Sequence, residues 1–296
     1  MLNQYYSPLR IGIFYEGTSF LHVSNYYNYH HPVKSRISLS GFHDFLIHKI
    51  AELENVDPNS LVIAENHYFR GRINASEASE RGSQLYNDRV FDDILMANGI
   101  EMHYLPIRTS KGKNEEKGVN TWLSLTAHQL ALAGKIDIAV FIFFDTEYIP
   151  LIKMINALGV RTVLLKWDFE YINEENQIII TKTSHDLFLL ARHKIEMTKE
   201  IEEGLQTENK LIQDLFVKPD TSDQPQTDPS KNRSQILKLM DGYGFIKYQN
   251  NNLFFHSSNV IGDFSELQVG DMVEFEIDKN DKGEDVAVEI IKYISI

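Results

Sequence analysis

Residues 218–234, KPDTSDQPQTDPSKNRS, contain no hydrophobic residue and are rich in Pro, Ser, Thr, Asp and Gln. Such a segment cannot bury enough apolar surface to offset the entropy lost on ordering, so it predicts a flexible linker. At 296 residues the chain is also longer than one average domain. We therefore predict two domains, at residues 1–216 and 234–296, joined by a linker at residues 217–233.

Before the linker, apolar runs alternate with helical patterns. The strand-like runs lie at residues 10–16, 60–69, 100–107, 136–144 and 161–167, and the helical patterns at 42–53, 83–99, 118–135 and 146–159. This alternation predicts an α/β fold in which helices sandwich a parallel sheet. The continuous apolar run AVFIFF (139–144) suits a central strand buried on both faces. We expect residues 184–216 to form a last helix that leads towards the linker.

After the linker the pattern changes to short strands. They lie at residues 234–240, 243–248, 252–258, 271–278 and 285–294, separated by turns rich in Gly and Asn. This spacing predicts a small all-β domain, a five-stranded barrel.

Composition excludes several classes of site. The chain has no cysteine, which excludes disulfides, thiolate metal sites and a cysteine nucleophile, and fits a reducing cytosol. We find no signal peptide pattern and no run apolar enough to cross a membrane, so we expect a cytoplasmic protein without membrane contact. The net charge of −13 argues against a large basic surface but not against a local nucleic-acid site.

Acidic residues follow two of the predicted strands. Glu16 ends the first strand, Asp145 and Glu147 follow the fourth, and Asn120 stands near the start of the helix that begins at about residue 118. Ligands bind parallel sheets at the carboxyl ends of the strands. Oxygen ligands gathered there suit Mg²⁺ or Mn²⁺, which can activate water for attack on phosphate. The alternative is that these residues cap helices.

The same residues carry a family resemblance. The segment 117–165 resembles the NYN family, the LabA-like branch of the PIN-type nucleases, through K-G-V-N at 117–120 and F-F-D-T-E at 143–147. The resemblance covers residues 10–195 and includes E-G-T-S at 16–19, where the family has D-G-x-N. Glu16, Asn120 and Glu147 replace aspartates of the family pattern.

This resemblance implies a PIN-like fold and a metal-dependent endoribonuclease. Glu16, Asp145 and Glu147 would hold Mg²⁺ or Mn²⁺, and Asn120 would assist. Members of the superfamily often pair, so a homodimer is a further expectation. The alternative is a catalytically decayed, non-enzymatic RNA-binding or regulatory protein.

Basic residues follow the second and third predicted strands on the same edge, and they are Arg70, Arg72, Lys111, Lys113 and Lys117. They are candidates for holding phosphate. The alternative is that each is a solvated loop charge.

Aromatic residues alternate along two strands of the predicted barrel. Side chains at alternate positions share one face, which groups Tyr243 with Phe245 and Phe254 with His256. On an exposed face, such rings are platforms for unpaired bases, each contributing about 1–3 kcal/mol. We expect the intervening Ile246 and Phe255 to fill the core.

These strands resemble a cold-shock domain. The resemblance covers residues 234–293 and rests on D-G-Y-G-F-I at 241–246 and L-F-F-H-S at 253–257. It implies an OB-type barrel that binds single-stranded RNA, and single-stranded DNA as a second ligand. Together the two resemblances predict a protein that acts on RNA.

Overall fold

The computed structural model describes residues 7–80, 84–110, 113–172, 177–218, 232–240, 242–248, 251–261, 264, 267–280 and 283–292. The chain divides into two compact units, residues 1–218 and 219–296. Of the linker predicted at 217–233, residues 219–231 lie outside the described residues. Within the described part of the chain, no helix combines the length and apolar character needed to cross a membrane.

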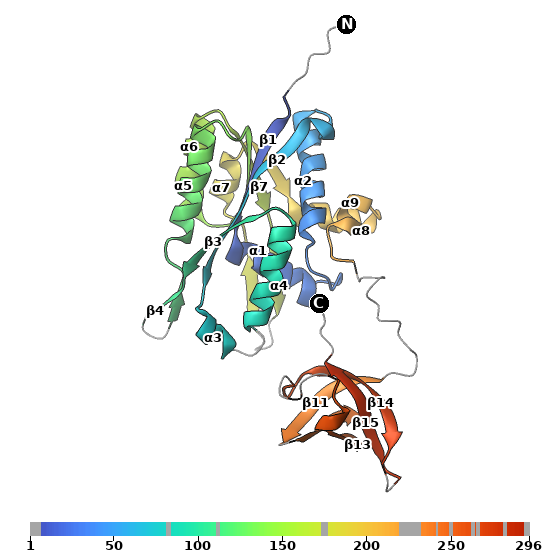
Figure 1. Ribbon diagram of the computed structural model, residues 1–296. Helices are drawn as coiled ribbons and strands as arrows, with labels where there is room; N and C mark the ends of the chain where they lie inside the picture. The colour runs from blue at the N-terminus through green and yellow to red at the C-terminus, as the bar shows by residue number, and fades with distance from the viewer. Residues whose placement is uncertain are drawn as a thin grey trace. The chain divides into compact units, whose positions relative to one another are not determined.

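A six-stranded sheet forms the centre of the first unit (Figure 1), with the order β10-β7-β6-β1-β2-β3. Its strands are β1 (Leu9–Glu16), β2 (Leu61–Arg72), β3 (Glu101–Pro106), β6 (Ile138–Ile142), β7 (Arg161–Lys166) and β10 (His193–Glu196). All neighbouring pairs are parallel. The predicted parallel sheet is therefore confirmed.

Helices cover both faces of this sheet. One face packs against α1 (Gly17–Tyr29), α2 (Leu39–Glu54), α4 (Gln84–Ala97), α8 (Met197–Gln206) and α9 (Lys210–Asp214). The other packs against α5 (Val119–Leu132), α6 (Ile149–Ala157) and α7 (His185–Leu190). Along β6, Val140 and Ile142 enter the first core and Phe141 enters the second, as expected for a central strand.

The predicted last helix at 184–216 is wrong. The chain instead forms α7, the edge strand β10, and then α8 and α9. Pairing with β7 satisfies the hydrogen-bonding groups on one side of β10, whose Ile195 is buried at 1% exposure. The chain turns between α8 and α9 at Glu208, which has a positive φ of 53°, and Gly204 lets the two helices pack closely because a Cβ there would meet the Ile212 side chain. An edge strand offers unpaired hydrogen-bonding groups to β10, and this long-range gain outweighs local helix propensity.

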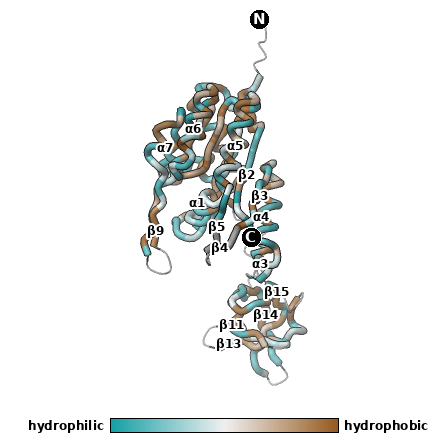
Figure 2. The backbone as a smooth tube through the Cα atoms, turned by 90° about the vertical axis from the view of Figure 1, so that its left-hand side faces the viewer, coloured by the Kyte–Doolittle hydropathy of each residue, from teal (hydrophilic) through white to brown (hydrophobic). Residues whose placement is uncertain are grey.

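Two hairpins and two helices were not predicted. The hairpins are β4 (Arg108–Ser110) with β5 (Lys113–Glu115), and β8 (Phe169–Ile172) with β9 (Ile178–Thr181). The helices are α1 and the short α3 (Ala75–Ser79). The three isoleucines of β9 colour it brown in Figure 2, and Ile178 and Ile180 are exposed.

The second unit is a closed barrel with the order β11-β12-β13-β15-β14. Its strands are β11 (Asn232–Met240), β12 (Tyr243–Tyr248), β13 (Asn251–His256), β14 (Met272–Lys279) and β15 (Asp285–Lys292). Ile246, Phe255 and Phe275 fill the interior, each at 0% exposure. The five-stranded barrel and the core positions predicted for Ile246 and Phe255 are confirmed.

Candidate nucleic-acid interface and carboxylate edge

The predicted aromatic residues lie on one outer face of the barrel. Tyr243 is directly opposite His256, and Phe245 is directly opposite Phe254, in the antiparallel pair β12–β13. Opposite residues of such a pair project to the same side of a sheet. We call these four residues the aromatic face.

The rings of the aromatic face form one cluster. The ring centroids of Tyr243 and Phe254 are 5.7 Å apart, those of Phe245 and Phe254 are 5.9 Å apart, and those of Tyr243 and Phe245 are 6.1 Å apart. Phe254 is 37% exposed, although its neighbour Phe255 is fully buried. These contacts hold the rings in place while leaving surface for a base to stack on.

His256 extends the aromatic face with a polar group. The backbone N–H of Ser258 donates to Nδ1 of His256 at 3.2 Å, and the Ser258 hydroxyl lies 2.9 Å from the same atom. When Nδ1 accepts from the backbone, the proton of the neutral ring is on Nε2. The exposed ring then offers an N–H donor beside the stacking surface.

Two lysines that the sequence analysis did not select share this face. Lys238 is directly opposite Phe245, and Lys247 lies two residues beyond Phe245 on the same strand. Neither forms an ion pair with another described residue. The alternation along β12 contained this signal, since Lys247 has the same parity as the aromatic residues.

The other basic residues of the barrel that the structure describes each lie beside a carboxylate. These pairs are Arg233 with Glu274, Lys279 with Asp285 and Lys292 with Asp271. Residues 233–296 hold 6 Lys and Arg against 11 Asp and Glu. Positive charge is therefore available at the aromatic face even though the barrel is acidic as a whole.

In the first unit, the predicted acidic residues lie at the carboxyl ends of the two strands that flank the switch point of the sheet. The strands β2 and β3 extend from one side of β1, whereas β6, β7 and β10 extend from the other. Such a reversal opens a crevice at the carboxyl ends of the two central strands, here β1 and β6. Glu16 is the last residue of β1, and Asp145 follows β6 closely.

Glu16 caps a helix as well as ending a strand. Its carboxylate accepts the N–H of Thr18 at 3.2 Å and that of Ser19 at 2.8 Å, at the start of α1. Burial raises the pKa of the Glu16 carboxyl, the hydrogen bonds from Ser19 and Thr18 oppose this, and the charge of Glu116 raises it further. Glu116 in turn accepts the Thr18 hydroxyl at 3.1 Å. Glu16 therefore caps α1, as the alternative interpretation of the sequence expected.

The other predicted residues surround Tyr148. The Tyr148 hydroxyl donates to Oδ1 of Asn120 at 2.8 Å, and Nδ2 of Asn120 donates to Glu147 at 2.7 Å. Asp145 begins the same turn without a side-chain capping bond. The pKa of Tyr148 is raised, first by burial and then by the charges of four carboxylates: Glu16, Asp145, Glu147 and Glu116. Hydrogen bonds therefore join Asn120 and Glu147 to this buried phenol, whereas Glu16 and Asp145 act on it through their charge.

Their spacing is wider than that of one ion's ligands. Among the described residues, one group of three side chains brings its ligand atoms within 4.8 Å of one another, and it consists of His67, Glu101 and His103. The predicted carboxylates do not form such a group. The oxygen donors suit Mg²⁺ or Mn²⁺. Their side chains would have to converge before they could share an ion.

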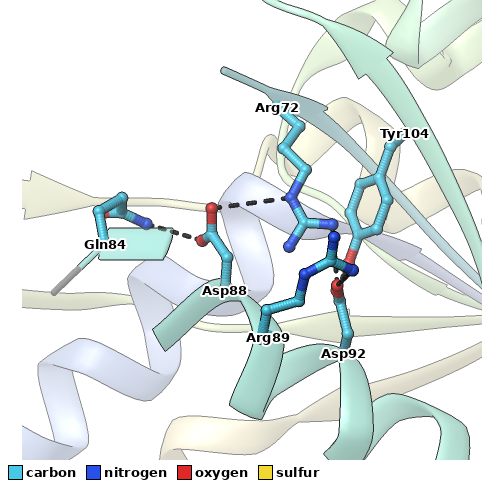
Figure 3. A network of polar contacts seen from close by, with 6 residues as sticks. All are labelled: Arg72, Gln84, Asp88, Arg89, Asp92 and Tyr104. Carbon is cyan, nitrogen blue, oxygen red and sulfur yellow. Dashed lines mark hydrogen bonds and ion pairs between the residues drawn. The ribbon is translucent and has the colours of Figure 1, made fainter. Parts of the chain in front are cut away.

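The predicted basic residues have different surroundings. Figure 3 shows Arg72 held by the carboxylates of Asp88, at 3.6 Å, and Asp92, at 2.9 Å, with its guanidinium 4.3 Å from the Tyr104 ring centroid. This network occupies the Arg72 guanidinium. Arg70 has a buried Nε without a hydrogen-bond partner among the described residues, whereas Lys117 is exposed two residues before the start of α5. Lys111 and the side chain of Lys113 lie outside the described residues.

Comparison with known proteins identifies the second unit. Residues 235–293 match the family described as the 'Cold-shock' DNA-binding domain, which confirms the cold-shock resemblance and indicates nucleic-acid binding by the barrel. No curated protein matches the chain.

Two solved structures are similar to the chain at low levels. One is VPA0982, a protein of unknown function from Vibrio parahaemolyticus RIMD 2210633, with 14% identity over 66% of this chain and 95% of that chain, and a TM-score of 0.42. The other is drosophila Unr CSD456, with 14% identity over 43% of this chain and 54% of that chain, and a TM-score of 0.20. Neither similarity is high enough to bear on function.

Proposed function

We propose that the protein binds single-stranded RNA on the aromatic face of its cold-shock barrel. The observation that carries this proposal is the clustering of Tyr243, Phe245 and Phe254 beside Lys238 and Lys247, two lysines without an ion pair among the described residues. Exposed rings stack on unpaired bases, and lysines contact the phosphates that join them.

The negative charge of the barrel determines which interactions we expect to contribute to binding and how affinity should depend on salt. The surplus of Asp and Glu in residues 233–296 repels phosphate at a distance. Binding then depends on short-range stacking and on the two lysines, and it falls with rising salt by a slope of about 0.7 per phosphate neutralised. We therefore expect little affinity for double-stranded RNA, whose bases are already stacked.

Fluorescence anisotropy with labelled oligonucleotides tests the proposal. The triple variant Tyr243→Ala, Phe254→Ala, His256→Ala should lose single-stranded RNA binding by about 100-fold or more, because each stacking side chain contributes about 1–3 kcal/mol. Lys279→Ala, a lysine engaged by Asp285, is the control and should bind as the unchanged protein does. Retained affinity in a folded triple variant would place the binding surface elsewhere.

The choice of nucleic acid is tested in the same assay. Single-stranded RNA, single-stranded DNA and double-stranded RNA of one sequence are compared at equal salt. The proposal expects single-stranded RNA to bind most tightly and the duplex least. Tighter binding of single-stranded DNA than of single-stranded RNA would contradict the proposal and make single-stranded DNA the ligand of the aromatic face.

A second candidate function is a metal-dependent endoribonuclease in the first unit, the activity that the NYN resemblance implies. It is favoured by the gathering of Glu16, Asp145 and Glu147 near Tyr148 at the switch point of the sheet. These carboxylates would hold Mg²⁺ or Mn²⁺, with Asn120 positioning Glu147 through its amide. The ion would supply an activated water and neutralise charge on the phosphate.

Incubation of labelled single-stranded RNA with Mg²⁺ or Mn²⁺ tests this second function. Asp145→Asn should abolish a metal-dependent cleavage, and Asp186→Asn, which changes an exposed aspartate at the start of α7, should not. Cleavage that survives Asp145→Asn would exclude this edge as its source. Binding without cleavage in the unchanged protein would assign the chain to the non-enzymatic alternative.

A further inference from the structure

Two histidines and a glutamate meet on the neighbouring strands β2 and β3 of the first unit. In the parallel pair β2–β3, His67 is directly opposite Glu101, and His103 lies two residues further along β3. One ligand atom from each of the three side chains lies within 4.8 Å of the other two. Through the register of the sheet, His103 is level with Phe69, which is directly opposite Glu16, so the cluster lies two strands from Glu16 and contains none of the predicted carboxylates.

The distances between these atoms match those around a single metal ion. Nδ1 of His67 is 3.0 Å from Nε2 of His103, and the Glu101 carboxylate oxygens lie 3.7 Å from the first and 3.6 Å from the second. The two Glu101 distances end on different oxygens, and they are close to the separation of about 3.3–3.6 Å between neighbouring ligand atoms bound at about 2.0–2.2 Å to one tetrahedral ion.

A second carboxylate orients the buried histidine. Nε2 of His67 lies 3.2 Å from Glu65, so the ring donates its Nε2–H to that carboxylate and turns the lone pair of Nδ1 towards His103 and Glu101. A histidine that ligates a metal through one nitrogen and donates the other to a carboxylate is the usual arrangement in protein metal sites.

Aromatic neighbours hold both imidazoles in place. The His103 ring stacks on Phe69 at 4.3 Å between centroids, and Trp122 from α5 meets it edge-on at 5.0 Å. The His67 ring stacks on Phe14 at 5.7 Å. Rigid rings lose little entropy when they bind an ion, which favours affinity.

The third side chain opens the cluster to solvent. The side chains of His67 and His103 are 5% and 10% exposed, whereas that of Glu101 is 67% exposed on the edge strand of the sheet. An ion can therefore enter from the Glu101 side and keep a water as a further ligand.

We propose that His67, Glu101 and His103 bind a divalent transition-metal ion of the zinc class, with Glu65 positioning His67. Imidazole nitrogen favours Zn²⁺, Co²⁺, Ni²⁺ or Cu²⁺ over Mg²⁺ and Ca²⁺, which take oxygen ligands. The competing explanation is a direct hydrogen bond between the two imidazoles, which the 3.0 Å separation also permits. The proposal is independent of the nucleic-acid and nuclease functions.

Titration calorimetry of the metal-free, full-length protein with Zn²⁺ tests the proposal. The expected result is one tight site per chain that Mg²⁺ does not occupy. His103→Gln and Glu101→Gln should each weaken that site by about 100-fold or more, and Glu65→Gln by about 10- to 100-fold, the range seen when an outer carboxylate is lost. Glu101→Gln changes an exposed residue, so it keeps the test valid if His103→Gln does not fold.

A second histidine provides the matched control. His48→Gln changes an exposed histidine on α2 and should leave Zn²⁺ affinity unchanged. With Co²⁺ in place of Zn²⁺, the unchanged protein should show visible absorption that is lost in Glu101→Gln. The absence of a tight site, or equal affinity in Glu101→Gln and the unchanged protein, would overturn the proposal and leave the imidazole hydrogen bond as the explanation.

Discussion

Replacement of Phe254 by alanine tests whether the aromatic face binds nucleic acid. Phe254 touches both other rings of the cluster, at 5.7 Å and 5.9 Å, and is 37% exposed. A base stacked on an aromatic side chain contributes about 1–3 kcal/mol, so Phe254→Ala should raise the Kd for single-stranded RNA by about 5- to 150-fold. We expect the upper part of this range, because the remaining rings also lose the neighbour that fixes their orientation.

The cost in stability should be smaller than the cost in binding. The variant loses two ring contacts, each contributing about 0.5–1.5 kcal/mol when fully formed, and the partial exposure of Phe254 reduces this contribution. Thermal unfolding should therefore show a folded barrel at the temperature of the binding assay.

The assay is fluorescence anisotropy at one fixed salt concentration, because affinity for nucleic acid depends on salt. Ile291→Ala is the matched control, since Ile291 is 39% exposed on the barrel but lies on β15, opposite Glu274 of β14. A folded Phe254→Ala variant whose Kd stays within about twofold of the unchanged protein would refute stacking on this face.

Three further predictions concern charge. Lys247→Ala should lower the slope of log Kd against log salt by about 0.7, measured by anisotropy between low and physiological salt, and an unchanged slope would exclude a phosphate contact. Arg72→Ala should lower the free energy of unfolding, measured by urea titration, by about 2–3 kcal/mol, because it leaves the Asp92 carboxylate, which is 6% exposed, without its main partner. Arg89→Ala is the control and should lower it hardly at all, because the Arg89 side chain is 72% exposed. Burial lowers the pKa of His43 from 6.5 to about 4, so as the pH falls the unfolded chain takes up this proton before the folded chain does. The free energy of unfolding, measured by urea titration at each pH, should therefore fall by about 2 kcal/mol between pH 7 and pH 5. His43→Asn should remove that part of the loss.

Local patterns of apolar residues predicted most of the strands and helices of the first unit. The apolar runs at 10–16 and 136–144 become the central strands β1 and β6, and the helical patterns at 42–53 and 118–135 become α2 and α5. These elements follow from periodicity because each has a continuous apolar face to bury. The same reasoning failed for residues 184–216, where pairing with β7 overrides the helical pattern and creates β10.

For the barrel, alternation along the strand was enough to separate the two faces. Tyr243 and Phe254 lie outside and Ile246 and Phe255 inside, as a period of two requires. Which lysines remain without a carboxylate partner depends on neighbouring strands. Alternation alone placed Lys247 beside the aromatic face, but only the structure showed that the other described basic residues of the barrel lie beside acids.

The sequence by itself determined which residue types end each strand, and therefore that Glu16 and Asp145 would reach one edge of the sheet. The sequence also offered the capping role that Glu16 takes at the start of α1, whereas only the tertiary structure placed Asn120 between Glu147 and Tyr148. It alone brought together His67 and His103, which are 36 residues apart. The physical reason is that strand and helix formation depend on near neighbours, whereas a ligand set depends on strand order and register, which the whole sheet settles at once.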